Sequence, residues 1–197
     1  MTRRRLLGAT AAAAVAVLAE RLAPRVAHAN LAPEPMRSAL PGARAHGRGL
    51  LRWWGFRVYE ATLWTGVTFE AERWTSQPFA LEIRYARAFS GPALADSSAG
   101  EIDKLGIGSE VSRREWAEAM RALFPPVDAG DRLVALHRPG RPTTFWLNER
   151  RLGEVADPAF GPAFFAIWLD PRTPAPALRE ALLRGADGAR ATSAETR

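Results

Sequence analysis

Few side chains in this sequence could do chemistry, and their types are limited. The chain has no cysteine, which excludes a thiol nucleophile and a thiolate metal site. His46 and His137 have no carboxylate at metal-ligand spacing, so no metal site is predicted. Ser97-Ser98 lacks the glycine-flanked context of a nucleophilic serine. The remaining candidates are an anion-anchoring arginine and two hydrogen-bonding phenols: Arg48 or Arg52, Tyr59 and Tyr85.

Each of these candidates also has a purely structural interpretation. An arginine on a strand is ordinarily solvated, with its aliphatic stem on apolar surface. A tyrosine at the edge of a core commonly satisfies its hydroxyl locally. The neighbouring Trp53 and Trp54 point to opposite faces of a strand, so at most one of them can line a given cavity.

Two extended segments carry most of these candidates. Residues 50–54 and 56–64 place β-branched and aromatic side chains at a period of two, which predicts strands. Gly55 between them indicates a kink, a bulge or a tight reversal. Apolar residues on both parities predict that both faces of the second strand are covered. Residues 79–85 (FALEIRY) alternate and predict a third, half-buried strand.

Helix-start signals and turn residues organise the remaining chain. Residues 132–137 and 143–147 flank a Pro-Gly turn and predict a hairpin, and residues 148–153 predict a second polar turn. The predicted helices begin near Ser90, Ser112, Asp157 and Thr173. Three strands, two helices, two strands and two helices predict an α+β fold, with helices gathered on an antiparallel sheet.

The N-terminal residues have the composition of an export signal. Three arginines at residues 3–5 precede an uncharged run at residues 6–18, and cleavage is predicted between Ala29 and Asn30. The arginines favour the twin-arginine type, with an ordinary Sec signal or an uncleaved anchor as alternatives. The run is too short to cross a bilayer of about 30 Å at about 1.5 Å per residue. The predicted location is periplasmic or otherwise exported.

Removing this signal lowers the net charge. Five arginines and one glutamate in residues 1–29 carry +4 of the total +6, which leaves +2. The remaining arginines alternate with carboxylates, so no nucleic-acid partner is predicted. We expect an irregular leader at residues 30–46, one domain at residues 47–185 and a disordered tail at residues 186–197. No transmembrane segment is predicted after the signal, and the oligomeric state is not indicated.

Several short strings between residues 47 and 183 match a known pattern in order and spacing. They are GLLRWWG (49–55), VYEATLW (58–64), LEIRY (81–85), Trp116, AGD (129–131), LGE (152–154) and FFAIWL (164–169). This series resembles the chalcone isomerase-like family, in particular its bacterial, exported, non-plant branch. The resemblance implies an open-faced β-sandwich, in which a layer of α-helices covers the antiparallel sheet and a cleft lies between them.

The resemblance also implies where catalytic residues would stand. Plant chalcone isomerases use an arginine, threonines, and a tyrosine and an asparagine on the helix after the third core strand. Here Leu94 takes the position of the tyrosine and Glu101 that of the asparagine. Leu94 cannot donate a hydrogen bond, and Glu101 has the wrong charge for a developing anion. Tyr59 stands near the first threonine position and Thr144 could match the second, but the two replacements argue against chalcone isomerase activity.

Related members of the fold bind fatty acids without catalysis, holding the carboxylate with an arginine and a tyrosine in an apolar cleft. Arg52 with Tyr59 or Tyr85 could do the same, because a guanidinium fork matches a carboxylate. The predicted function is therefore binding of a fatty acid or another apolar carboxylate, without a cofactor. Two alternatives remain open. One is an isomerase in which an arginine, Tyr59 and Thr144 converge, and the other is an envelope accessory or structural protein without a ligand.

Overall fold

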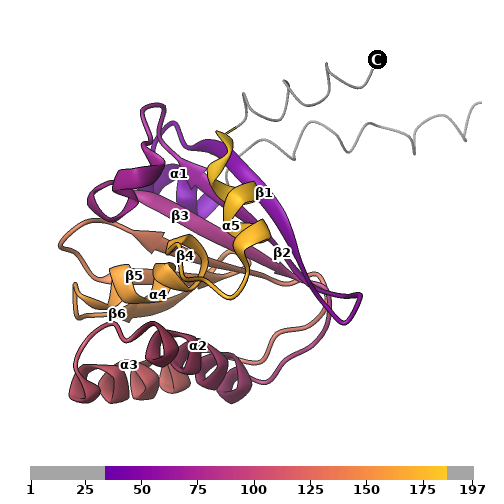
Figure 1. Ribbon diagram of the computed structural model, residues 1–197, viewed down its shortest axis with the longest axis vertical. Helices are drawn as coiled ribbons and strands as arrows, with labels where there is room; N and C mark the ends of the chain where they lie inside the picture. The colour runs from indigo at the N-terminus through magenta and orange to yellow at the C-terminus, as the bar shows by residue number, and fades with distance from the viewer. Residues whose placement is uncertain (1–33, 186–197) are drawn as a thin grey trace, which may run out of the picture. The chain divides into compact units, whose positions relative to one another are not determined.

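The computed structural model describes residues 34–185 of the chain, and they form an α+β domain (Figure 1). The strands are β1 Arg44–Trp53, β2 Phe56–Thr65, β3 Phe79–Tyr85, β4 Arg132–His137, β5 Thr143–Leu147 and β6 Arg150–Val155. The helices are α1 Glu34–Ala39, the short 3-10 helix η1 Ala71–Ser76, α2 Gly91–Leu105, α3 Glu110–Leu123, α4 Phe160–Leu169 and α5 Pro176–Leu183. The six strands form one antiparallel sheet in chain order, which confirms the predicted fold class.

Four helices cover one face of this sheet. Alternate β3 residues, among them Leu81 and Ile83, share one hydrophobic core with side chains from α2, α3, α4 and α5. All residues of α4 except Pro162 are buried, as expected for a helix that is apolar on every side. Helices α2 and α3 lie side by side over the lower part of the sheet in Figure 1. We refer below to this side of the sheet as the helical face.

Local capping signals begin α2 and α3, although one predicted start is displaced. Ser90 Oγ accepts a hydrogen bond from the Ala93 backbone N–H at 3.3 Å, which confirms the predicted start of α2. The N-cap of α3 is Ser109, whose Oγ accepts from the Ser112 N–H at 3.1 Å. The predicted start at Ser112 is therefore wrong by one turn, because the earlier serine satisfies the same free N–H groups.

The opposite face of the sheet is covered by α1, which corrects the expectation of an irregular leader at residues 30–46. The structure places a helix at Glu34–Ala39 and begins β1 at Arg44. Met36 and Leu40 are buried against an apolar patch on the sheet that includes Trp64. Burial of these two side chains stabilises the helix. The prolines of the segment do not prevent it, because proline is tolerated in the first turn of a helix.

A second correction concerns residues 148–153, predicted as a polar turn. Only the start of this segment is a turn, with Asn148 at a φ of 56°, and Arg150–Val155 forms the edge strand β6. Its first residues are charged and exposed. Charged edge strands discourage pairing with another chain, and their polarity conceals the strand from a search for alternating apolar residues.

Some predictions fall on residues outside the described range 34–185. They are the export signal at residues 1–29, its cleavage between Ala29 and Asn30, and the tail at residues 186–197. Among the described helices, none combines the length and the apolar character needed to cross a bilayer.

The helical face contains one buried histidine, His137, which gives a pH prediction. Its ring contacts Phe79 and Phe165, and Nε2 lies 2.9 Å from the Thr75 carbonyl oxygen, to which it donates as an N–H. Burial lowers the pKa of His137 below its usual 6.5.

We expect the unfolding free energy to fall as the pH drops below about 6.5. In that range His137 takes up a proton in the unfolded chain but stays neutral in the folded one. The slope reaches at most about 1.4 kcal/mol per pH unit, and ends where folded His137 itself is protonated. Urea titrations of the wild type and His137→Gln between pH 7 and the acid limit of folding measure it. The glutamine amide can still donate to Thr75. Equal pH slopes in the two proteins would contradict the prediction.

Candidate ligand-binding site

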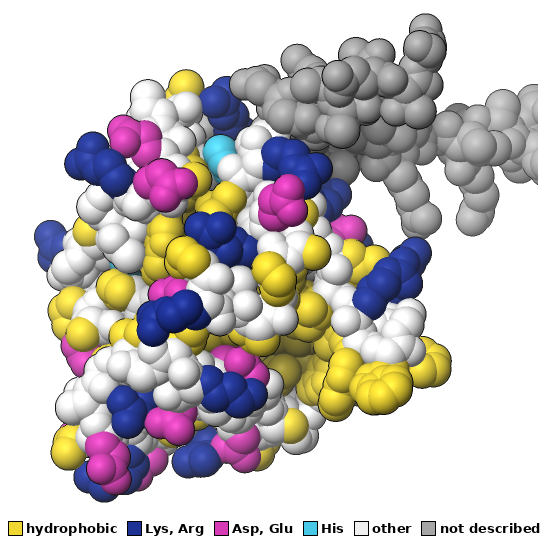
Figure 2. Space-filling view, in the orientation of Figure 1, with side chains coloured by type: hydrophobic (Ala, Val, Ile, Leu, Met, Phe, Trp, Pro, Cys, Tyr) yellow, Lys and Arg dark blue, Asp and Glu magenta, His cyan; other side chains and the backbone are white. Residues whose placement is uncertain are grey.

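A cavity of about 600 Å³ lies between the helical face of the sheet and helices α2 and α4. Figure 2 shows its opening as a hollow among hydrophobic side chains, beside the tip of the β1–β2 hairpin. Most of its wall is apolar, and five buried residues of the core contribute to it: Ile83, Phe124, Leu133, Phe164 and Ile167. The polar side chains of the wall are therefore few enough to be considered singly.

Two of them, Tyr59 and Tyr85, are neighbours on paired strands. They lie opposite each other in the β2–β3 register, with ring centroids 6.3 Å apart in an edge-to-face arrangement. The Tyr59 hydroxyl accepts a hydrogen bond of 2.8 Å from the indole N–H of Trp168 on α4. Because this bond uses an acceptor lone pair, the hydroxyl hydrogen of Tyr59 remains available for donation.

Burial raises the pKa of both phenols, which are neutral at neutral pH. Desolvation raises the pKa of Tyr59 to about 12; the bond from Trp168 opposes this shift, and the nearby Glu101 carboxylate adds to it. Desolvation also raises the pKa of Tyr85, with a further contribution from Tyr59. At neutral pH the two hydroxyls therefore act as donors and add no negative charge to the cavity.

Charged side chains stand only at the margin of the cavity. Arg52, exposed at the end of β1, lines the mouth, and its Nη1 donates to the Gly55 carbonyl at 3.3 Å. Within residues 34–185 Arg52 has no ion-pair partner. Glu101 also lines the cavity, but its carboxylate pairs with Lys104 on the next turn of α2 at 2.8 Å. In the described part of the chain, the one charge at the cavity without an ion-pair partner is thus positive.

The other two residues predicted to bind ligand do not face the cavity. Arg48 lies on the opposite face of the sheet, where its Nε donates to Thr62 Oγ1 at 3.2 Å and lies 3.6 Å from Glu60 Oε1. Thr144 is buried on that same opposite face, paired with Leu136 and Glu154. The structure therefore groups Arg52, Tyr59 and Tyr85, and it does not bring Thr144 to the point where an isomerase would need it.

The sequence also misses one polar contact of the site. Trp168, the partner of Tyr59, lies 109 residues away in the chain. The sequence around it predicts only an apolar helix residue, because its neighbours in α4 are apolar too. The two positions taken from the plant enzymes, Leu94 and Glu101, do line the cavity. Among the described residues no cluster of three or more His, Asp or Glu side chains could hold a metal ion.

Comparisons with known proteins agree with this fold. A family model described as chalcone isomerase-like matches residues 46–184. A search of curated protein sequences finds no match. Among solved structures, a fatty-acid binding protein from Arabidopsis thaliana is similar in fold, with a TM-score of 0.56 and 13% sequence identity. The similarity covers 73% of this chain and 87% of the plant protein.

Proposed function

Because the chain belongs to the chalcone isomerase-like family, we propose that its cavity binds a fatty acid or a similar apolar carboxylate. The observation that carries this proposal is an apolar cavity with, among the residues 34–185, a single cation without an ion-pair partner at its mouth, Arg52. Its volume falls in the range of small-molecule sites, roughly 300–1,000 Å³. The fold similarity to a plant fatty-acid binding protein supports the same class of ligand.

The distribution of charge suggests how such a ligand would lie. Its carboxylate would meet the guanidinium of Arg52, which offers a fork of donors. The hydrocarbon chain would run inward along Ile83 and Phe164, where burial of each CH₂ group stabilises the complex by about 0.8 kcal/mol. The carboxylate of Glu101 would repel the anion, so the head group belongs nearer Arg52.

Native mass spectrometry of the protein, purified without detergent, tests the proposal. We expect an adduct with the mass of a fatty acid, recovered as the free acid after denaturation. A mass without adduct, unchanged after incubation with a lipid extract, would exclude this function. We also propose that the protein acts after export, on the composition of residues 1–29. The same spectrum tests this point, since an exported and processed chain begins at Asn30.

Two of the three arginines of β1, Arg52 and Arg48, provide a matched pair of variants. Replacing Arg52 with glutamine is expected to weaken fatty-acid binding about tenfold, because a charge-assisted hydrogen bond is lost. Arg48→Gln, on the same strand but the opposite face, is expected to bind like the wild type. Displacement of a fluorescent fatty acid measures both affinities. Equal affinities in Arg52→Gln and Arg48→Gln would show that Arg52 does not hold the carboxylate.

A further inference from the structure

The tip of the β1–β2 hairpin exposes three large aromatic side chains. Trp53, Trp54 and Phe56 are 70%, 84% and 72% exposed, more than any other large hydrophobic side chains of the described residues except Val67, which equals Trp53. They form a hydrophobic knob at the end of the hairpin (Figure 2), which projects beyond the helical layer in Figure 1. We call these three residues the aromatic tip. Contiguous apolar exposure of this kind marks an interaction site.

The backbone of the tip gives a second reason to seek a partner. Trp54 and Gly55 form the two-residue turn, with φ angles of 50° and 81°. Such a turn favours Asn or Asp followed by Gly, whereas a bulky side chain at positive φ is unfavourable. The exposed ring of Trp54 returns little packing to the fold. Stability of the domain therefore does not explain a tryptophan at this position, and a strained residue of this kind is a sign of function.

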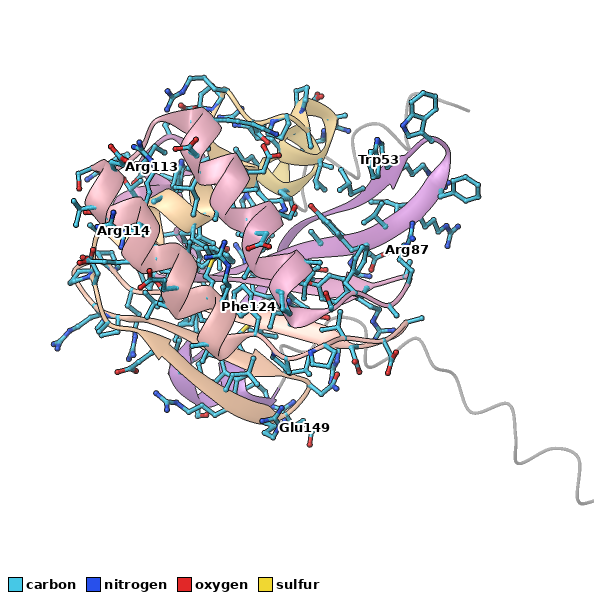
Figure 3. All side chains as sticks on the ribbon, turned by 90° about the horizontal axis from the view of Figure 1, so that it is seen from below. Trp53, Arg87, Arg113, Arg114, Phe124 and Glu149 are labelled. Atoms are coloured by element: carbon cyan, nitrogen blue, oxygen red, sulfur yellow. The ribbon has the colours of Figure 1, made fainter. Side chains whose placement is uncertain are left out.

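The charged residues of the hairpin that flank the tip are positive. No Asp or Glu occurs from residue 44 to residue 59, a stretch that includes Arg52 and Arg57. The loop after β3 contributes Arg87 and joins the hairpin through the Ala86 N–H, which donates to the Val58 carbonyl at 2.9 Å. Figure 3 shows Trp53 and Arg87 on the same side of the domain. Tryptophan beside arginine suits the boundary between hydrocarbon and anionic head groups, where the indole inserts and the guanidinium pairs with phosphate.

We propose that the aromatic tip docks on the surface of an anionic lipid bilayer. The tip is continuous with the cavity, because Arg52 and Trp53 line its mouth. Docking would therefore turn the mouth toward the membrane, and an apolar carboxylate would pass between bilayer and cavity with little exposure to water. This role in transfer rests on the proposed function, whereas the docking itself rests on the tip alone.

A second copy of the chain is a poorer fit to this surface. A stable protein interface buries about 800 Å² on each partner, which three side chains at the end of one hairpin do not supply. The arginines that flank the tip would also make two tips repel each other. A bilayer meets neither difficulty, since it needs only insertion of a few aromatic rings and offers the opposite charge.

Vesicle co-sedimentation of the full chain tests the proposal, with vesicles of phosphatidylcholine alone or mixed with phosphatidylglycerol. The variant is Trp54→Asn, which suits the turn and keeps the fold. Val67→Asn, another exposed apolar position just beyond the other end of β2, is the control. We expect Trp54→Asn to lower partitioning into the anionic vesicles at least about tenfold, and Val67→Asn to leave it unchanged. Hydrogen exchange of residues 53–57 should slow when anionic vesicles are added.

Unchanged partitioning of Trp54→Asn, or unprotected tip amides, would overturn the proposal. So would equal binding to neutral vesicles, or a dimer that Trp54→Asn dissociates in sedimentation velocity. Trp54 does not line the cavity, so this variant should bind a soluble fatty acid like the wild type. Docking without acid binding would refute the proposed function and leave the tip proposal standing, and acid binding without docking would do the reverse.

Discussion

Replacing Leu94 with tryptophan is expected to reduce fatty-acid affinity at least about tenfold, while the unfolding free energy changes by less than about 1.5 kcal/mol. Leu94 lies on α2, where its half-buried side chain forms part of the cavity wall. An indole there would occupy space that the hydrocarbon chain needs. Because the cavity has room for the added ring, the fold should tolerate it better than a close-packed core would.

Val111→Trp provides the control for this substitution. Val111 is an exposed residue of α3 that does not line the cavity, so its replacement adds the same ring to a helix without filling the site. Displacement titrations measure the affinity and urea denaturation the stability. Wild-type affinity in Leu94→Trp would mean that ligands bind elsewhere.

The second large effect concerns the helix that packs on β1. Gly47→Ala should lower the unfolding free energy by about 2–3 kcal/mol. A Cβ atom at Gly47 would overlap the backbone carbonyl oxygens of Ala181 and Leu182, so α5 would have to move away from the strand. A Cβ atom at Gly49, two residues on, would likewise press on the side chains of Leu178 and Ala181 in the same interface.

Gly66→Ala is the matched control, because no atom lies within 4 Å of a Cβ placed at that glycine. Its unfolding free energy should stay within about 0.5 kcal/mol of the wild type, as for most exposed positions. Urea denaturation of the three proteins makes the comparison. A Gly47→Ala protein as stable as Gly66→Ala would show that α5 does not pack so closely on β1.

Local signals in the sequence were sufficient for much of the fold. The β1–β2 hairpin, β3 and the start of α2 at Ser90 each depend on residues within a few positions of one another, such as Gly55 in its turn and the serine cap. Elements without such signals were missed. The polar edge strand β6 has no alternation of apolar residues, and α1 owes its order to the distant patch around Trp64.

The candidate site shows the same limit. Period-two alternation puts Arg48 and Arg52 on the same face, but a shift in the β1–β2 register between Leu51 and Arg52 brings only Arg52 to the cavity. A bulge of this kind leaves no clear mark in the sequence. The orientation of Thr144 was equally hidden, since both faces of β5 are buried and its pattern does not distinguish them.

Calorimetric titration of the full chain with a long-chain fatty acid and with the matching fatty alcohol tests the proposed function most directly. The two ligands share the hydrocarbon chain and differ in the carboxylate that Arg52 is proposed to hold. We predict that the acid binds roughly ten to a hundred times more tightly than the alcohol, because a charge-assisted hydrogen bond contributes a binding free energy of that size. Failure of both ligands to bind would contradict the proposal that the cavity is a lipid site, and equal affinities would contradict the role of Arg52.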